Sequence, residues 1–237
     1  MTTRRMRTGY AGTGPGPITP DGCAVELYER LPIGEEPDVI EAAVPAGASI
    51  LELGCGVGRV THPLLERGFT VTAVDESAEM LERVHGARTV RSPIEDLDLG
   101  GERFDVVMLA SFLVHAGDLA VREGLLRTCR RYVADDGCVL FQKEGEGWHE
   151  RAPWERPAYG GKAVFRLASS EPVGDGVRSV QFDYVFPDAA WTQVFLSRPL
   201  TDEAFAEALA GAGLSVETYL TEDRTWVRAR PVVSAAK

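Results

Sequence analysis

Residues 50–77 read ILELGCGVGRVTHPLLERGFTVTAVDES and place three glycines, Gly54, Gly56 and Gly58, between two apolar runs, the second of which ends at an acid. The first apolar run predicts a buried strand, and the glycines let the chain turn sharply into a helix that begins near Arg59. Because glycine has no Cβ, such a turn also lets a ligand approach the backbone amides closely. The stretch therefore predicts a strand, a turn and a helix that bind a ligand through the turn.

The same alternation of short apolar runs and amphipathic stretches extends over residues 48–143. Strands that are buried on both faces and separated by helices are typical of a parallel, doubly wound sheet. Beyond this range the segments KAVFRLAS, VRSVQFDYVF and WTQVFLSR alternate like antiparallel strands. We expect an α/β fold with a Rossmann-like, mostly parallel seven-stranded sheet, an antiparallel C-terminal hairpin and a small antiparallel β insertion.

Four segments follow from this pattern. The first 20 residues are rich in Gly, Thr and Pro, so we expect them to be ordered only by docking on another part of the protein, and the start MTTRRMR to be a loose tail. Asp21 is placed to cap a following helix. The predicted organisation is a tail with lid helices (1–45), a ligand-binding core (46–145), a cap (146–200), and a closing helix with strands (201–237).

Composition limits the classes of function. The formal net charge of −11 and the pI near 4.9 argue against binding to nucleic acid, which needs positive charge. The basic start MTTRRMR is not followed by an apolar segment, so we expect neither a signal peptide nor a membrane anchor, and a cytoplasmic protein. The four cysteines do not have zinc-ligand spacing and no HExxH motif occurs, so we expect no metal.

Asp75 lies 21 residues after Gly54, at the end of the second apolar strand. A carboxylate at this place in a doubly wound sheet can accept hydrogen bonds from the two hydroxyls of a ribose. A dinucleotide-binding turn would place its third glycine at position 59, which is Arg59 here. The pattern therefore favours a nucleoside ligand other than a dinucleotide.

The motif ELGCGVG at residues 52–58 continues into VDES with Met80, then SPIEDL and FDVVMLAS. Over residues 48–143 the chain resembles the class I S-adenosylmethionine-dependent methyltransferases of the small-molecule type. The resemblance implies S-adenosylmethionine as cofactor and S-adenosylhomocysteine as product. Where the family often has an acid that contacts adenine, this chain has Pro93, so the contact is assigned to the next two residues. The residues assigned to the cofactor are Glu52, Gly54, Cys55, Gly56, Gly58, Asp75, Glu76, Ser77, Met80, Ile94, Glu95 and Ala110.

Methyl transfer from a sulfonium requires the protein mainly to align the nucleophile and exclude water. A base is needed only if the acceptor holds a proton at neutral pH, and the catalytic candidates are His115, Tyr28 and Glu144. The candidate acceptor-binding residues are Tyr28, Phe112, His115 and Trp148. His149 is a further candidate for the base. The structural alternatives are that His115 and Tyr28 pack in the core and that His149 lies at the surface of a mobile loop.

The expected acceptor is a small metabolite or natural product, and whether its nucleophile is oxygen, nitrogen or carbon stays open. Two alternatives also stay open: a nicotinamide-dependent oxidoreductase, and a non-catalytic protein that keeps the nucleoside site. We expect a monomer or a homodimer that binds neither nucleic acid nor membrane.

Overall fold

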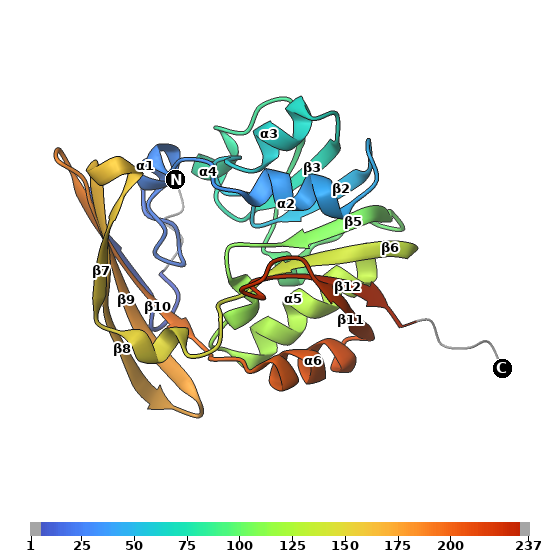
Figure 1. Ribbon diagram of the computed structural model, residues 1–237. Coiled ribbons are helices and arrows are strands. Elements are labelled where there is room, and N and C mark those ends of the chain that lie inside the picture. Colours follow the sequence, from blue (N-terminus) through green and yellow to red (C-terminus); the bar gives the residue numbers. More distant parts are fainter. Residues whose placement is uncertain (1–5, 233–237) are drawn as a thin grey trace. The chain divides into compact units, whose positions relative to one another are not determined.

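The computed structural model describes residues 6–232, so most of the basic start MTTRRMR lies outside the described residues. The chain divides into two compact units (Figure 1). The β unit comprises Met1–Pro32 and Gly147–Pro199, and the core unit comprises Ile33–Glu146 and Leu200–Lys237. The chain passes from one unit to the other three times along its length.

The core unit contains a seven-stranded sheet in the order β11-β12-β6-β5-β2-β3-β4. Its strands are β2 (Ser49–Leu53), β3 (Thr70–Asp75), β4 (Arg88–Arg91), β5 (Phe104–Leu109), β6 (Val133–Gln142), β11 (Leu214–Tyr219) and β12 (Trp226–Pro231). The strands from β6 to β4 pair in parallel, whereas β12 is antiparallel to β6 and β11 is antiparallel to β12. This arrangement confirms the predicted Rossmann-like sheet and its closing hairpin.

Helices cover both faces of this sheet (Figure 1). They are α2 (Glu36–Ala43), α3 (Thr61–Glu66), α4 (Ala78–Leu81), α5 (Leu119–Tyr132) and α6 (Asp202–Gly211), with the 3₁₀ turns η1 (Ile94–Asp96) and η2 (Leu113–His115). On one face Ile40 of α2 and Leu64 of α3 pack with Ile50. On the other face Phe205 of α6 packs with Leu51 in the same apolar cluster as α5.

The continuous apolar runs of the sequence follow from this double cover. Ile50 and Leu51 are neighbours in β2, so their side chains point to opposite faces, yet both are 0% exposed. Full burial of each such side chain contributes roughly 1.5–3 kcal/mol. A strand with water on one face would gain this from every second residue, which is why the parallel strands show runs rather than alternation.

The β unit contains a five-stranded sheet in the order β1-β10-β9-β8-β7, in which neighbouring strands are antiparallel. Its elements are β1 (Ala11–Thr13), α1 (Val25–Arg30), η3 (Trp148–Arg151), β7 (Trp154–Ala158), η4 (Tyr159–Gly161), β8 (Ala163–Gly174), β9 (Val177–Val185) and β10 (Ala190–Ser197). One face is aromatic: Phe182 lies 4.9 Å from Tyr184 and 6.1 Å from Phe165 between ring centroids. The opposite face is polar, and Arg166 pairs there with Glu155.

The N-terminal segment is ordered by docking on a distant strand. Ala11 pairs with Val194 in the register of β1 on β10, and the indole nitrogen of Trp191 donates to Pro15 O at 2.9 Å. Asp21 is not a helix cap, because α1 begins at Val25 and its capping residue makes no side-chain hydrogen bond. The Asp21 carboxylate instead accepts from the Thr19 hydroxyl. Pairing with a distant strand supplies the order that the local composition cannot.

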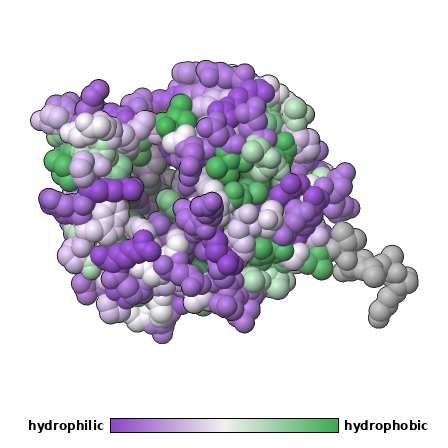
Figure 2. Space-filling view, viewed as in Figure 1, coloured by the Kyte–Doolittle hydropathy of each residue, from purple (hydrophilic) through white to green (hydrophobic). Residues whose placement is uncertain are grey.

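Polar residues cover most of the face shown in Figure 2, and apolar residues are scattered among them. This agrees with the formal net charge of −11. Within residues 6–232, no helix has the length and apolar character needed to cross a membrane.

Candidate functional site

The glycine turn follows β2 directly and is tied to the neighbouring strand. The backbone N–H groups of Gly54 and Cys55 both donate to Val74 O, at 2.8 and 2.9 Å. Gly56 has a φ of +55°, and the nearest atom that a Cβ there would meet among the described residues is Met80 Sδ, 4.0 Å away. Glycine is therefore required by the left-handed backbone rather than by crowding, and the space above the turn is open to a ligand.

Asp75 ends β3 and is held in place by backbone amides. Its Oδ2 accepts from Gly56 N at 2.9 Å and its Oδ1 accepts from Ser77 N at 2.8 Å. Ser77 also caps α4, since its hydroxyl accepts from Met80 N at 3.2 Å. These hydrogen bonds fix the carboxylate beside the turn, where an acid at the end of a strand can bind the hydroxyls of a ribose. The turn and the acid thus form one preorganised unit.

Glu52 lies beneath the turn rather than at its surface. Its carboxyl group is 4% exposed and accepts from the Thr61 hydroxyl at 2.5 Å. Burial raises the pKa of Glu52 to about 7, although the hydrogen bond from Thr61 opposes the shift. Cys55 is also buried, and burial raises the pKa of its thiol. Both residues support the turn from the core side, and any contact of theirs with a ligand stays a prediction.

The two residues proposed for the third strand end lie in η1. The Ile94 side chain approaches the turn, since its Cδ1 would be 3.8 Å from a Cβ on Gly54. Glu95 lies against α5, where a Cβ on Gly124 would be 2.8 Å from Glu95 Cβ. Ile94 is therefore the better placed of the two for an apolar contact beside the turn.

The loop after β5 has a strained backbone. Ser111 and Phe112 have φ values of 53° and 61°, in the left-handed region that residues with a side chain rarely adopt. The Ser111 N–H donates to Gln142 Oε1 at 2.9 Å, which holds the loop against the end of β6. The Phe112 side chain is 38% exposed although it is large and apolar. Strain of this kind clusters at functional sites, and Ala110 and Phe112 follow the carboxyl end of a parallel strand.

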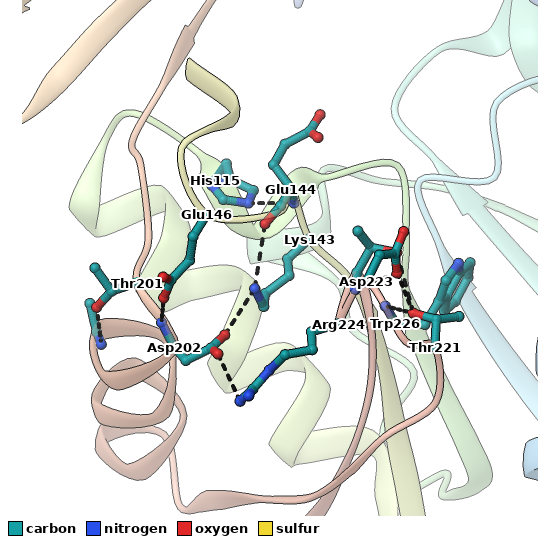
Figure 3. A network of polar contacts seen from close by, with 12 residues as sticks. His115, Lys143, Glu144, Glu146, Thr201, Asp202, Thr221, Asp223, Arg224 and Trp226 are labelled. Atoms are coloured by element: carbon teal, nitrogen blue, oxygen red, sulfur yellow. Dashed lines mark hydrogen bonds and ion pairs between the residues drawn. The ribbon is translucent and has the colours of Figure 1, made fainter. Parts of the chain in front are cut away.

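His115 lies at the end of the same loop and is 4% exposed. Its Nε2 accepts from Glu144 N at 2.9 Å (Figure 3). In the neutral ring Nδ1 therefore carries the proton, which makes the Nδ1 side a donor. This geometry favours orientation of the ring over proton abstraction by Nε2. Figure 3 shows that Glu144 contacts His115 through its backbone nitrogen and not through its side chain. The role of the Glu144 carboxylate as a base stays a prediction.

Comparison with known proteins agrees with this geometry. Residues 51–141 match the family described as a methyltransferase domain, a range that includes the turn, Asp75 and the loop after β5. Over residues 51–141 the chain is therefore similar to a methyltransferase domain, in agreement with its resemblance to the class I S-adenosylmethionine-dependent methyltransferases. The resemblance found in the sequence is thereby confirmed.

Individual methyltransferases show how far the similarity extends. An uncharacterized methyltransferase of Mycobacterium bovis is 38% identical over 94 residues, which cover 38% of this chain and 39% of the relative's own length. A dTDP-3-amino-3,6-dideoxy-alpha-D-glucopyranose N,N-dimethyltransferase of Streptomyces fradiae is 26% identical over 83% of this chain and 85% of its own. An amino pentose methyltransferase from Micromonospora echinaspora, solved with S-adenosylmethionine bound, shares the fold. Its TM-score is 0.63 at 21% identity, over 82% of this chain and 88% of the other.

Two of the residues predicted to line the acceptor pocket lie in the β unit. The Tyr28 hydroxyl accepts from Cys23 Sγ at 3.4 Å, and the pKa of Tyr28 lies well above its usual range because of Cys23 and burial. The Trp148 ring lies edge-to-face against His149, with centroids 5.0 Å apart. The acceptor-binding roles of Tyr28 and Trp148 stay predictions.

The prediction that His149 is a surface residue is wrong. The side chain is 2% exposed, and its Nε2 lies 2.7 Å from Ser197 Oγ. Burial, with a smaller effect of Arg178, lowers the pKa of His149 to about 4. A neutral, hydrogen-bonded imidazole inside the β unit stabilises structure there.

Lys143, which follows β6 directly, was not predicted from the sequence to be part of the site. It is 1% exposed, and its Nζ forms an ion pair with Asp202 Oδ1 at 3.1 Å (Figure 3). In the sequence, the sign of its burial is that Lys143 directly follows the apolar run GCVLFQ. A lysine at the end of a strand is usually exposed to water, so this position did not stand out.

A groove of about 600 Å³ lies at the amino ends of the parallel strands of the core sheet, opposite the glycine turn. Its lining includes the first residues of four strands, Ser49, Thr70, Arg88 and Phe104. Ligands of doubly wound sheets bind outside the carboxyl ends, so this groove is not the candidate site. In the described part of the chain, no group of three or more His, Cys, Asp or Glu could hold a metal ion.

Proposed function

We propose that this protein transfers a methyl group from S-adenosylmethionine to a small-molecule acceptor. The observation that carries the proposal is the Asp75 carboxylate, fixed by Gly56 N and Ser77 N beside an open glycine turn. A ribose on this carboxylate would place an adenosyl group across the ends of β2 and β3, with the glycine turn open toward its sulfur-bearing end.

The residues present fit an adenosyl cofactor. Asp75 offers acceptors to the two ribose hydroxyls, Met80 and Ile94 offer apolar contacts, and the backbone at Gly56 leaves space. When bound, the cofactor would supply an electrophilic methyl group with a good leaving group. The chain then has to bind the acceptor, orient it and exclude water. Phe112 and the Nδ1 side of His115 are the groups proposed for these tasks.

We further propose that the acceptor is a natural product or metabolite, and that a sugar amine is the first class to test. The Streptomyces fradiae relative is named for an amino sugar nucleotide, and the solved Micromonospora echinaspora protein for an amino pentose. An amine with a pKa near neutrality needs little help to lose its proton, which suits a site where Nε2 of His115 already accepts a hydrogen bond from a backbone amide.

The nicotinamide alternative requires a third glycine at position 59. Arg59 occupies it and forms an ion pair with Glu36 at 2.6 Å between Nη2 and Oε1. Titration calorimetry with S-adenosylhomocysteine and with NADH tests the choice. We expect micromolar binding of the first and no heat from the second, and the reverse result would overturn the proposal.

A non-catalytic protein would bind the cofactor without turnover. Incubation with S-adenosylmethionine and a panel of amino sugar nucleotides, read by mass spectrometry, should show an acceptor heavier by one methyl group. The Asp75→Ala variant is the control for background methylation. The predicted cytoplasmic location and monomeric or homodimeric state also stay proposals, and native mass spectrometry tests the latter.

A further inference from the structure

A buried charged network lies where β6 ends (Figure 3). Lys143 Nζ pairs with Asp202 Oδ1 at 3.1 Å, and Asp202 Oδ2 pairs with Arg224 Nη2 at 2.7 Å. Lys143 is 1% exposed, whereas the side chains of Asp202 and Arg224 are 21% and 52% exposed. The network therefore extends from the solvent-exposed guanidinium group of Arg224 to the buried ammonium group of Lys143 inside the core unit.

An ammonium group loses its hydration in such a place, and pairing offsets the cost only if the geometry is good. An apolar side chain of similar volume, such as methionine, would fill the same space without that cost. The network is thus hard to explain by stability alone, and its value lies in what it holds in a fixed position.

The ammonium group holds the backbone of the next residue. Lys143 Nζ donates to Glu144 O at 3.4 Å, and Lys143 N donates to Thr225 O at 2.8 Å. The Glu146 carboxylate accepts from Asp202 N at 2.8 Å, so α6 holds the segment at a second point. Residues 143–146 are therefore fixed to both α6 and the turn before β12.

This segment in turn holds the ring of His115. Glu144 N donates to His115 Nε2 at 2.9 Å. The carbonyl oxygen of the same residue accepts the hydrogen bond from Lys143 Nζ. A shift of this backbone would leave Nε2 without its donor, and the proton could then move between the two ring nitrogens. The position of Glu144 thus decides which nitrogen of His115 is a donor.

We propose that Lys143 and Asp202 are positioning residues that, through the Glu144 peptide, fix His115 as the Nδ1–H tautomer at the ligand-binding end of the sheet. The structural part stands without any reaction. Its consequence for catalysis rests on the proposed methyltransferase function.

The test reads the tautomer directly. Two-bond ¹H–¹⁵N correlation spectra of the full chain resolve the ring nitrogens of each histidine, and a His115→Gln variant assigns the His115 signals. In the wild type we expect one fixed Nδ1–H tautomer. In Lys143→Met both nitrogen shifts should move toward the average of two exchanging tautomers.

Loss of the ammonium group could also destabilise the variant, because Asp202 then keeps only the more exposed Arg224 as its ion-pair partner. The double variant Lys143→Met with Asp202→Asn removes the charge of Asp202 and should regain thermal stability while His115 stays unfixed. Arg230→Gln is the matched control, since it breaks an ion pair of 2.6 Å with Glu217 elsewhere in the same sheet. A wild-type His115 spectrum in the folded double variant would overturn the proposal.

A kinetic measurement separates positioning from the proposed function. With a methylated acceptor in hand, the double variant should lose roughly 10- to 100-fold in kcat while its KM for S-adenosylmethionine stays within about twofold. An unchanged kcat would reject the catalytic consequence. If the wild type methylates no acceptor, the proposed function fails, and the spectra still decide whether Lys143 positions His115.

Discussion

Glu52 in the core unit and His149 in the β unit are both buried, and burial shifts their pKa values in opposite directions. In the core unit Glu52 lies under the glycine turn, and burial raises its pKa to about 7. In the β unit His149 lies against Ser197, and burial lowers its pKa to about 4. Burial favours the neutral form in both cases, so the acid and the base shift in opposite directions. The comparison shows that the same physical cause, burial, gives pH effects of opposite sign for an acid and for a base.

The largest expected effect separates the two hydrophobic cores. Phe141→Ala in the core unit and Trp191→Ala in the β unit should each cost about 3–5 kcal/mol, because both side chains are almost fully buried. Hydrogen exchange should show lost protection in β5 and β6 for the first variant and in β9 and β10 for the second. Equal loss of protection in both units after either substitution would mean that the units unfold as one.

The next effect uses the opposite pH slopes. Between pH 4.5 and 7 the folded Glu52 holds a proton that the unfolded chain has released, so its contribution to stability falls as pH rises. The change is on the order of 3 kcal/mol. Glu52→Gln should remove this slope, as measured by chemical denaturation across the pH range.

His149 has the reverse sign. Between pH 6.5 and about 4 the unfolded chain binds a proton that the folded His149 does not, so its contribution is full above pH 6.5 and is lost as pH falls. His149→Gln can keep the bond to Ser197 and should remove the loss at low pH. Identical slopes in the wild type and this variant would contradict the burial argument.

Cofactor binding should depend on the core unit at one point. Asp75→Ala should weaken S-adenosylhomocysteine binding by about 1–3 kcal/mol through lost charge-assisted hydrogen bonds, and Gly56→Val should abolish it. Asp105→Ala is the matched control, since this aspartate also accepts from a backbone N–H, that of Ser49 at 2.8 Å, but at the amino end of β5. Unchanged affinity in both site variants would reject the assignment of the site.

The smallest effect compares two strained residues, one in each unit. Ser111 and Asp175 have φ values of 53° and 50°. Glycine adopts this region without cost, so each change to glycine should raise the free energy of unfolding by roughly 1 kcal/mol. Ser111→Gly should also slow methyl transfer because the Phe112 loop loses its fixed shape, whereas Asp175→Gly should not. Equal activity in the two variants would contradict a functional role for the strained backbone at Ser111.

Local pattern was sufficient wherever neighbours in sequence decide the structure. The alternation of apolar runs and amphipathic stretches around Gly54 predicted the parallel sheet. The position of Asp75 directly after the second apolar run predicted that it lies at the end of β3. The closing helix predicted within residues 201–237 is α6, and it is capped by Thr201, whose hydroxyl accepts from Ala204 N at 3.1 Å. These features depend on contacts within a few residues or within one βαβ repeat.

The sequence by itself determined the sheet, the glycine turn and the carboxylate beside it, because periodicity and spacing express those directly. Only the tertiary structure decided that residues 11–13 form a strand, that His149 is buried and that Lys143 supports His115 through Glu144. Each of these depends on a partner far away in the chain: β10, Ser197 and Asp202. A composition rich in glycine or a single charged residue carries no sign of such a partner, and it is the partner that supplies the free energy of ordering.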